Sequence, residues 1–297
     1  MIADWMSGLL DPFNYPFFVK GLVVATLAGA LCGLIGVYIT LRGMSYIGHG
    51  LSHAIFGGFA ASSIIGLNYF IGAGVWGLAS ALAINRVTRN RRIGADAAIG
   101  VITTASFALG VALLTRYGNK GIAFDTALFG SILGIDASDI WALVAVTALT
   151  VAVVFTNYRA LLFATFDPDV ADVSGVSVAR LDALLMLVLS LAILATLTII
   201  GVTLVAATLV IPAVVARMLT DRFSMMLRLS TLLGAGSGFV GMYLSYYLNV
   251  PSGTTIVLTG ATVFALVLLI TGGRRLYRVA GLDHNEAGAP TPVPTPS

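Results

Sequence analysis

Charged residues are scarce in this sequence. Asp, Glu, Lys and Arg make up 10% of its 297 residues, whereas about 25% is typical of soluble globular proteins. Apolar residues make up 58%, which excludes a fold that is surrounded only by water. Cysteine is nearly absent as well, and the single Cys32 excludes a disulfide framework. The net charge is only +3, and nothing in the sequence supports nucleic-acid binding.

Long apolar runs recur in the sequence. Runs of about 20 residues, the length that a helix needs to cross a bilayer, recur along the chain. Only helices and closed barrels satisfy every backbone group in lipid, and these runs do not alternate as barrel strands do. The number of spans is not fixed, because the sixth and seventh form one apolar stretch that only Gly201 and Pro212 interrupt. We therefore predict an all-α, polytopic transmembrane helical bundle of eight or nine spans, at residues 17–41, 44–66, 68–85, 95–115, 139–158, 182–200, 202–219, 229–248 and 255–272.

The basic residues favour one orientation of this bundle. With the N-terminus outside, the loops on the inner side hold 13 of the 16 Lys and Arg residues, in agreement with the positive-inside rule. We expect a multi-pass membrane protein with an external N-terminus and a cytoplasmic C-terminus. A single permease domain would cover residues 1–281, followed by a disordered cytoplasmic tail, rich in Pro and Thr, at residues 282–297.

Two of the three histidines lie inside the second predicted span, where ionisable side chains are costly and usually functional. His49 and His53 are four residues apart, so both imidazoles lie on one face of a helix. Two ring nitrogens can then reach one ion, and neutral imidazole suits zinc, copper, iron and nickel better than manganese. Further ligands could come from a symmetric dimer or from the same subunit. The alternative is that both histidines hydrogen-bond neighbouring helices.

Motifs for catalysis are absent. The sequence has no GxSxG, no HExxH and no pair of carboxylates inside a span. We therefore predict that the chain is not an enzyme, has no catalytic residue and holds no cofactor tightly. The phosphate-binding GxxxxGKS/T loop is absent too. If ATP drives this protein, a separate subunit must hydrolyse it.

A short helix is predicted between the fifth and sixth spans. Asp167 can cap it, Pro168 suits its first position, and Gly175 can end it. Acidic residues fall in its first turn, where the helix dipole favours them. It can dock an ATPase on the cytoplasmic side, or it can be an ordinary interfacial helix. Its candidate residues are Asp167, Pro168, Asp169, Val170, Ala171, Asp172 and Gly175.

The sequence resembles the permease subunits of zinc, manganese and iron ABC importers, the family called ABC-3. The resemblance covers about residues 2–272 and is most specific in LRGMSYIGHGLSHAIFGG, at residues 41–58, and in FDPDVADVSGV, at residues 166–176. It implies a homodimer of permeases in the lipid bilayer of a bacterial plasma membrane, two ATP-binding-cassette ATPase subunits, and an extracytoplasmic metal-binding protein that delivers the ion. It also implies that the helix from Asp167 to Gly175 couples to the ATPase.

The resemblance bears on the metal as well. In the family, the second-span motif usually has Asp and His four residues apart, and these are the expected metal ligands. Here His53 matches the histidine, and His49 stands in the place of the aspartate. Replacing a hard carboxylate by imidazole should favour zinc over manganese. We therefore expect import of Zn²⁺ or Mn²⁺, with zinc slightly favoured, and Fe²⁺ as a further candidate.

A hypothesis from a different class is a secondary transporter or channel for metals, which uses an ion gradient and needs no ATPase. Such transporters usually carry a titratable carboxylate within the bundle. None of the 13 acidic residues lies at the centre of a predicted span. A permease for large metal chelates is a third interpretation, but it would not need two histidines at ligand spacing. The metal ABC permease is therefore our prediction.

Overall fold

The computed structural model describes residues 11–89, 95–117, 128–130 and 135–286. Within these ranges the chain forms helices and no strand, so the all-α prediction is confirmed. The elements are η1 (Asp11–Asn14), α2 (Pro16–Leu41), α3 (Ser45–Ile65), α4 (Tyr69–Arg89), α5 (Ala95–Tyr117), α7 (Ala137–Thr156), α8 (Tyr158–Phe166), α9 (Pro168–Val173), α10 (Val178–Ile200), α11 (Val205–Leu219), α12 (Phe223–Leu248) and α13 (Ser252–Glu286).

Seven helices in the described part of the chain are long and apolar enough to cross a membrane. They are α2, α10, α12, α7, most of α4 and α5, and the first 20 residues of α13. Two further helices occupy predicted spans: α3 has 21 residues, with histidines and serines among them, and the apolar α11 has 15 residues. Every predicted span therefore coincides with a helix in the described ranges.

The sixth and seventh predicted spans are separate helices. α10 ends at Ile200, Gly201 has a φ of 87°, and α11 begins at Val205. Glycine adopts this conformation readily, unlike other residues, and a side chain here would overlap the carbonyl oxygen of Leu128. Gly201 therefore ends α10 and lets a loop pass close to the backbone. The sequence analysis did not predict α8, which follows α7 directly after Asn157.

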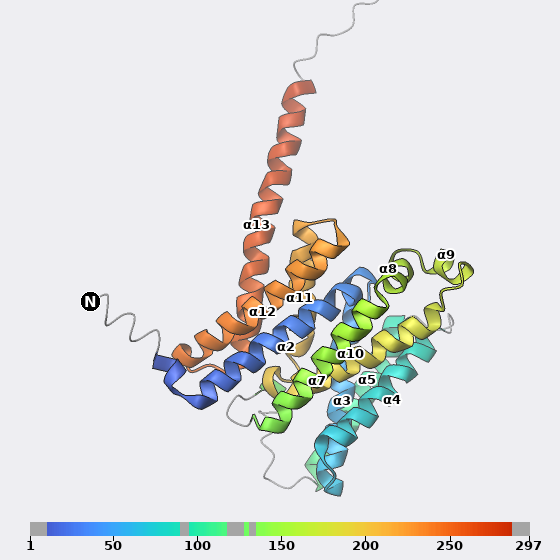
Figure 1. The fold of residues 1–297 in the computed structure, drawn as a ribbon, viewed down its shortest axis with the longest axis vertical. Helices are drawn as coiled ribbons and strands as arrows, with labels where there is room; N and C mark the ends of the chain where they lie inside the picture. Colours follow the sequence, from blue (N-terminus) through green and yellow to red (C-terminus); the bar gives the residue numbers. More distant parts are fainter. Residues whose placement is uncertain (1–10, 90–94, 118–127, 131–134, 287–297) are drawn as a thin grey trace, which may run out of the picture.

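Small residues bring α2 and α12 into close contact. A methyl group on Gly234 would overlap the carbonyl oxygen of Gly29, and the Ser230 hydroxyl donates to the Gly33 carbonyl oxygen at 2.6 Å. Between helices in lipid, close packing and hydrogen bonds of this kind supply the attraction. Figure 1 shows α2 and α12 side by side, with α3, α4 and α5 grouped in another part of the bundle.

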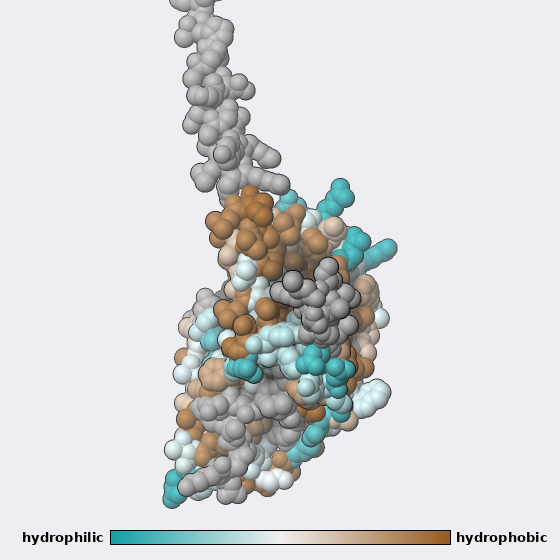
Figure 2. Space-filling view, turned by 90° about the vertical axis from the view of Figure 1, so that its left-hand side faces the viewer, coloured by the Kyte–Doolittle hydropathy of each residue, from teal (hydrophilic) through white to brown (hydrophobic). Residues whose placement is uncertain are grey.

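The surface of the bundle is rich in apolar side chains. Trp141 and Leu269 are each 72% exposed, and other large apolar residues lie open on most of the long helices. Figure 2 shows apolar patches on one face, largest in its upper part and interspersed with hydrophilic and pale residues lower down. Such a surface is costly in water, and it fits a protein whose helices contact lipid.

The two ends of the bundle differ in charge. At the end that we call the basic end, α2 and α7 finish and α8, α10 and α12 begin, beside Arg42, Arg159 and Arg222. At the opposite end η1 meets the end of α12, where the Tyr246 hydroxyl donates to Asp11 at 3.3 Å. Figure 1 shows α2 running from η1 to the neighbourhood of α8 and α9. The predicted inner and outer loops, as far as they are described, therefore lie at opposite ends.

A buried apolar cluster at the basic end ties α9 to the bundle. It includes Tyr38 of α2, Ala171 of α9 and Phe223 of α12. The rings of Tyr38 and Phe223 lie 5.4 Å apart, edge to face. A larger cluster fills the interior between α2, α3, α10 and α11. The short α9 is therefore anchored by one of its side chains to the ends of longer helices.

The last helix continues beyond the predicted domain boundary. The backbone of α13 is helical as far as Glu286, whereas the permease domain was predicted to end at residue 281. Residues 287–297 of the predicted tail lie outside the described ranges, as do Arg91 and Arg92 of a predicted inner loop. The division into a permease domain and a disordered tail therefore stays a prediction.

Candidate metal site and coupling helix

Both candidate metal ligands lie on α3, which packs tightly against its neighbours. A methyl group on Gly57 would overlap the carbonyl oxygen of Ser106 in α5, and one on Gly58 would overlap the β-carbon of Trp76 in α4. These glycines let the backbones approach closely, as small residues do between spanning helices. α3 is therefore held in a defined position, and its histidine-bearing stripe lies beside the contact with α5.

The structure brings the two histidines together. The ring centroids of His49 and His53 are 4.5 Å apart. Nδ1 of His53 lies 2.9 Å from the carbonyl oxygen of His49, and because a carbonyl oxygen only accepts, this contact assigns the ring proton to Nδ1. The lone pair of Nε2 is then available to a metal ion. Phe107 of α5 packs against the His53 ring at 4.9 Å between centroids and fixes its orientation.

The histidine face is accessible. His49 is exposed, His53 is partly exposed, and the neighbouring Tyr46 is 50% exposed. Within the described residues, no group of three or more His, Cys, Asp or Glu side chains could hold a metal ion. The described part of one chain therefore brings together two candidate ligands at this position. A complete coordination shell needs further ligands from elsewhere.

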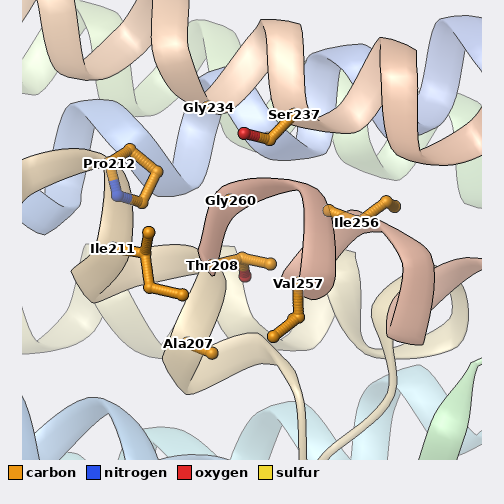
Figure 3. Close-up of a pocket in the computed structure, with 10 residues that line it drawn as sticks. Ala207, Thr208, Ile211, Pro212, Gly234, Ser237, Ile256, Val257 and Gly260 are labelled. Carbon is orange, nitrogen blue, oxygen red and sulfur yellow. The ribbon is translucent and has the colours of Figure 1, made fainter. Parts of the chain in front are cut away.

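A second polar spot inside the bundle lacks metal ligands. A small pocket lies between α2, α11, α12 and α13, and the hydroxyls of Thr208 and Ser237 are its polar side-chain groups. Figure 3 shows Pro212 in the wall of this pocket, near Thr208. Proline has no backbone N–H, so the helical hydrogen bond to the Thr208 carbonyl oxygen is missing. Hydroxyls and a carbonyl suit a water molecule better than a transition metal.

The predicted short helix is present as α9. The Asp167 side chain accepts a hydrogen bond from the Val170 backbone N–H at 3.1 Å, which is the expected N-cap. Pro168 is the first helical residue, and Gly175 follows the helix with a φ of 87°. Ala171 is buried, whereas Val173 is 91% exposed. One face of α9 therefore packs against the bundle and the other is exposed. Asp169 and Asp172 are also exposed.

One arginine connects the neighbourhood of α9 with the start of α3. The ε-nitrogen of Arg42 donates to the Thr165 hydroxyl of α8 at 3.1 Å, and its guanidinium forms an ion pair with Asp182 of α10. Arg42 follows directly after α2 and lies three residues before Ser45, where α3 begins. The sequence analysis counted Arg42 only as an inner-loop charge. The feature of the sequence that could have indicated this contact is Asp182, an opposite charge at the predicted inner end of another span.

Comparison with known proteins decides the family. The ABC 3 transport family matches residues 14–271 of the sequence. The chain belongs to this family. This assignment confirms the predicted resemblance and covers every described helix from α2 onward to the apolar part of α13.

The most informative relatives match over nearly their whole length. The chain is 39% identical to the manganese transport system membrane protein MntC of Halalkalibacterium halodurans, over 87% of this chain and 88% of that protein. It is 34% identical to the manganese import system permease protein ScaB of Streptococcus gordonii, over 94% and 99%. Among solved structures, a chain of PsaBC from Streptococcus pneumoniae in complex with Fab has a TM-score of 0.82 and 32% identity, over 94% and 100%.

Family membership decides between the classes of transporter. The chain is a multi-pass membrane permease subunit of an ABC importer, and ATP is hydrolysed by a separate subunit. The alternative of a secondary transporter driven by an ion gradient is therefore not supported. An importer of this kind implies an ATPase and a substrate-binding protein as partners.

Proposed function

We propose that this permease imports a divalent transition metal and that His49 and His53 bind the ion in transit. The observation that carries this proposal is the pair of neighbouring imidazoles on an accessible stripe of α3. Among the described residues, the hydrogen-bond contacts of the His53 ring stay within α3, with the His49 carbonyl oxygen and the Ser52 hydroxyl. A role as hydrogen-bonded glue between helices would instead need a partner on another helix.

The missing ligands suggest how the complex is assembled. Zinc is usually held by four ligands in a tetrahedron, and the pair supplies two. Because His49 is exposed, a second copy of the chain related by a two-fold axis could bring an equivalent pair to the same ion. We therefore propose a homodimer in the bilayer, with the metal path between the two α3 helices.

The cargo follows from two observations that point in different directions. MntC and ScaB are named for manganese, which favours manganese for this chain as well. Two imidazoles suit zinc better than manganese, which favours tighter binding of zinc at the pair. We propose that the complex transports both ions and that His49 raises its preference for zinc. Iron is the third candidate.

The orientation of the bundle completes the proposal. We place the basic end, with α8 and α9, in the cytoplasm of a bacterium, so that the N-terminus faces outward. An impermeant thiol reagent tests this in intact cells, on a chain whose only cysteine, the buried Cys32, is replaced by alanine. Cysteine at Asn68, exposed near the opposite end, should react from outside. Cysteine at Asp221, exposed at the basic end, should react only after lysis, and the reverse pattern contradicts the orientation.

The position of α9 suggests how ATP hydrolysis reaches the ion. Val170 is half exposed and Val173 is almost fully exposed, which fits a helix that presses into a groove of another protein. Ala171 on the other side is buried among ends of spanning helices. We propose that the ATPase docks on this exposed face and that its movement is transmitted through α8 and Arg42 to the start of α3.

Uptake by the purified complex in liposomes tests the proposal. We expect ATP-dependent accumulation of zinc and manganese inside vesicles, and loss of accumulation in His53→Ala. The matched control is His284→Ala, which removes the chain's third histidine and should transport normally. Accumulation that persists in His53→Ala at the wild-type rate would contradict the role of the pair. Accumulation of neither metal by the wild-type complex would contradict the cargo class.

A further inference from the structure

A hollow at the basic end, whose lining includes neither the histidine pair nor any residue of α9, has the features of an anion site. It has a volume of about 720 Å³ and lies between the junction of α7 with α8 and the first turns of α12. Its lining residues are Phe155, Thr156, Asn157, Tyr158, Arg159, Ala160, Ser224, Leu227 and Arg228. Two of these nine are arginines, and none is acidic.

Neither arginine forms an ion pair with a described residue. Arg159 and Arg228 are both exposed, and the described residues place no carboxylate within ion-pair distance of either. The described ion pair at this end uses Arg42 and Asp182 instead. Two guanidinium groups that face one hollow repel each other, so the arrangement is favourable when an anion lies between them.

Two helix starts add to the positive potential. α8 begins at Tyr158 and α12 begins at Phe223, and neither N-cap residue caps its helix with a side-chain hydrogen bond. The backbone N–H groups of a first helical turn have no acceptor within the helix, and the N-terminal end of the dipole is positive. Residues of both first turns, among them Ala160 and Ser224, line the hollow. Helix starts and guanidinium groups therefore converge on one space.

The depth of Arg228 indicates where the anion comes from. Arg228 lies five positions after Phe223, the first residue of α12, which is about 7.5 Å along the helix axis. Its ε-nitrogen donates to the Ser224 carbonyl oxygen at 3.3 Å, so the side chain bends back toward the basic end, as arginines do at a membrane boundary. One turn deeper on the same face, Leu232 is 67% exposed. In a bilayer whose surface lies at the basic end, the guanidinium would be at headgroup depth, above the exposed apolar Leu232.

The wall of the hollow that α7 forms also has exposed apolar side chains. Phe155, in the last turn of α7, is 65% exposed, and Val151, one turn deeper, is 38% exposed. α2 contacts both α7 and α12, and Figure 1 shows α2 passing between them. An acyl chain can therefore lie along apolar side chains of two helices while its phosphate lies between Arg159 and Arg228.

We propose that this hollow binds one anionic phospholipid from the leaflet at the basic end, with the lipid phosphate between Arg159 and Arg228. Basic pockets between spanning helices are suited to anionic headgroups, and each basic residue at the surface contributes about 1 kcal/mol. The bound lipid would join α7 and α8 to α12, which also meet at this end through side chains such as the rings of Tyr158 and Phe223. The site is independent of the metal and of the proposed cargo.

Native mass spectrometry of the full-length permease in detergent tests this proposal. Titration with phosphatidylglycerol should give one tightly retained lipid per chain, and titration with phosphatidylcholine should not. The double variant Arg159→Gln with Arg228→Gln should weaken phosphatidylglycerol binding by at least about tenfold. Arg180→Gln, which removes an exposed charge from the same end outside the hollow, is the matched control and should bind as the wild type does.

Three outcomes would overturn the proposal. Equal retention of phosphatidylglycerol by the double variant and the control would show that the hollow is not the lipid site. Displacement of the lipid by millimolar inorganic phosphate would show a site for soluble phosphate. In the complex assembled with the ATPase, loss of that subunit from the double variant, with lipid retention unchanged, would assign the two arginines to the protein interface.

Discussion

Arg42 and Asp182 form an ion pair that joins the end of α2 to the first turns of α10. The Arg42 side chain is 8% exposed and that of Asp182 is 22% exposed, so water screens the pair only weakly. The same guanidinium also donates to Thr165 of α8. Three segments that belong to different parts of the sequence are therefore held together at the point where the chain turns into α3.

Asp182→Asn removes one charge and leaves the Arg42 guanidinium in a site with little water. We expect the free energy of unfolding to fall by about 1.5–3 kcal/mol, because hydrogen bonds to charged groups contribute on this scale. We also expect less metal transported per ATP hydrolysed, since Arg42 leads into α3. Thermal unfolding in detergent and uptake in liposomes measure the two effects. Asp221→Asn, at an exposed position of the same end, is the control, and wild-type coupling in Asp182→Asn would argue against transmission through this pair.

A charge introduced on the exposed face of α9 should weaken the coupling between the permease and the ATPase. We expect Asp169→Lys and Val173→Lys to lower metal-stimulated ATP hydrolysis by roughly tenfold, the effect of losing about 1.4 kcal/mol of contact, while the amount of permease in the membrane is unchanged. Asp221→Lys makes the same charge change as Asp169→Lys at an exposed position outside α9 and should leave hydrolysis normal. Normal stimulation in both α9 variants would mean that the ATPase docks elsewhere.

Close approach of α2 and α12 can be tested with two glycines of one helix. In Gly234→Val the new side chain would collide with the backbone of α2, whereas at Gly236 no atom lies within 4 Å of an added methyl group. Overpacking a tight contact costs about 1–3 kcal/mol, so Gly234→Val should lower the thermal unfolding temperature in detergent. Gly236→Val should change it little, and equal unfolding temperatures for the two variants would contradict the described contact.

Local signals in the sequence predicted the elements that depend on neighbouring residues. The cap at Asp167, the proline at Pro168 and the spacing of His49 and His53 each act within about one helical turn, so they can be read without knowing the tertiary structure. The predicted spans followed from apolar runs, because a helix that crosses lipid needs about 20 mainly apolar residues.

Contacts between distant segments could not be predicted in this way. Arg42 and Asp182 are separated by 140 positions, and a single sequence does not say which faces of two apolar helices meet. The same limit applies to Gly57, which was not predicted to touch α5, and to α8, whose break from α7 at Asn157 lacks a strong signal such as glycine or proline. The lining of the lipid hollow combines residues from positions 155–160 and 224–228, which only the fold brings together.

The choice of metal should respond to the residue at position 49. His49→Asp replaces a nitrogen ligand by an oxygen ligand of a harder carboxylate, so the ratio of manganese to zinc uptake should rise. Competition uptake with both metals in the same vesicles measures this ratio directly. His49→Asn, which has a neutral oxygen donor of similar size, should raise the ratio less than His49→Asp does. An unchanged ratio in His49→Asp would show that the residue at position 49 does not contact the ion.

The central claim is that the histidine pair binds the ion during transport, and His53→Gln tests it most directly. Glutamine can still donate and accept hydrogen bonds, so it preserves a purely structural role, but it does not replace the imidazole nitrogen as a metal ligand. The measurement is the initial rate of ATP-dependent zinc and manganese uptake by the purified complex in liposomes. We predict that His53→Gln loses nearly all uptake while the complex stays assembled. Uptake at the wild-type rate, with unchanged preference between the two metals, would contradict the claim.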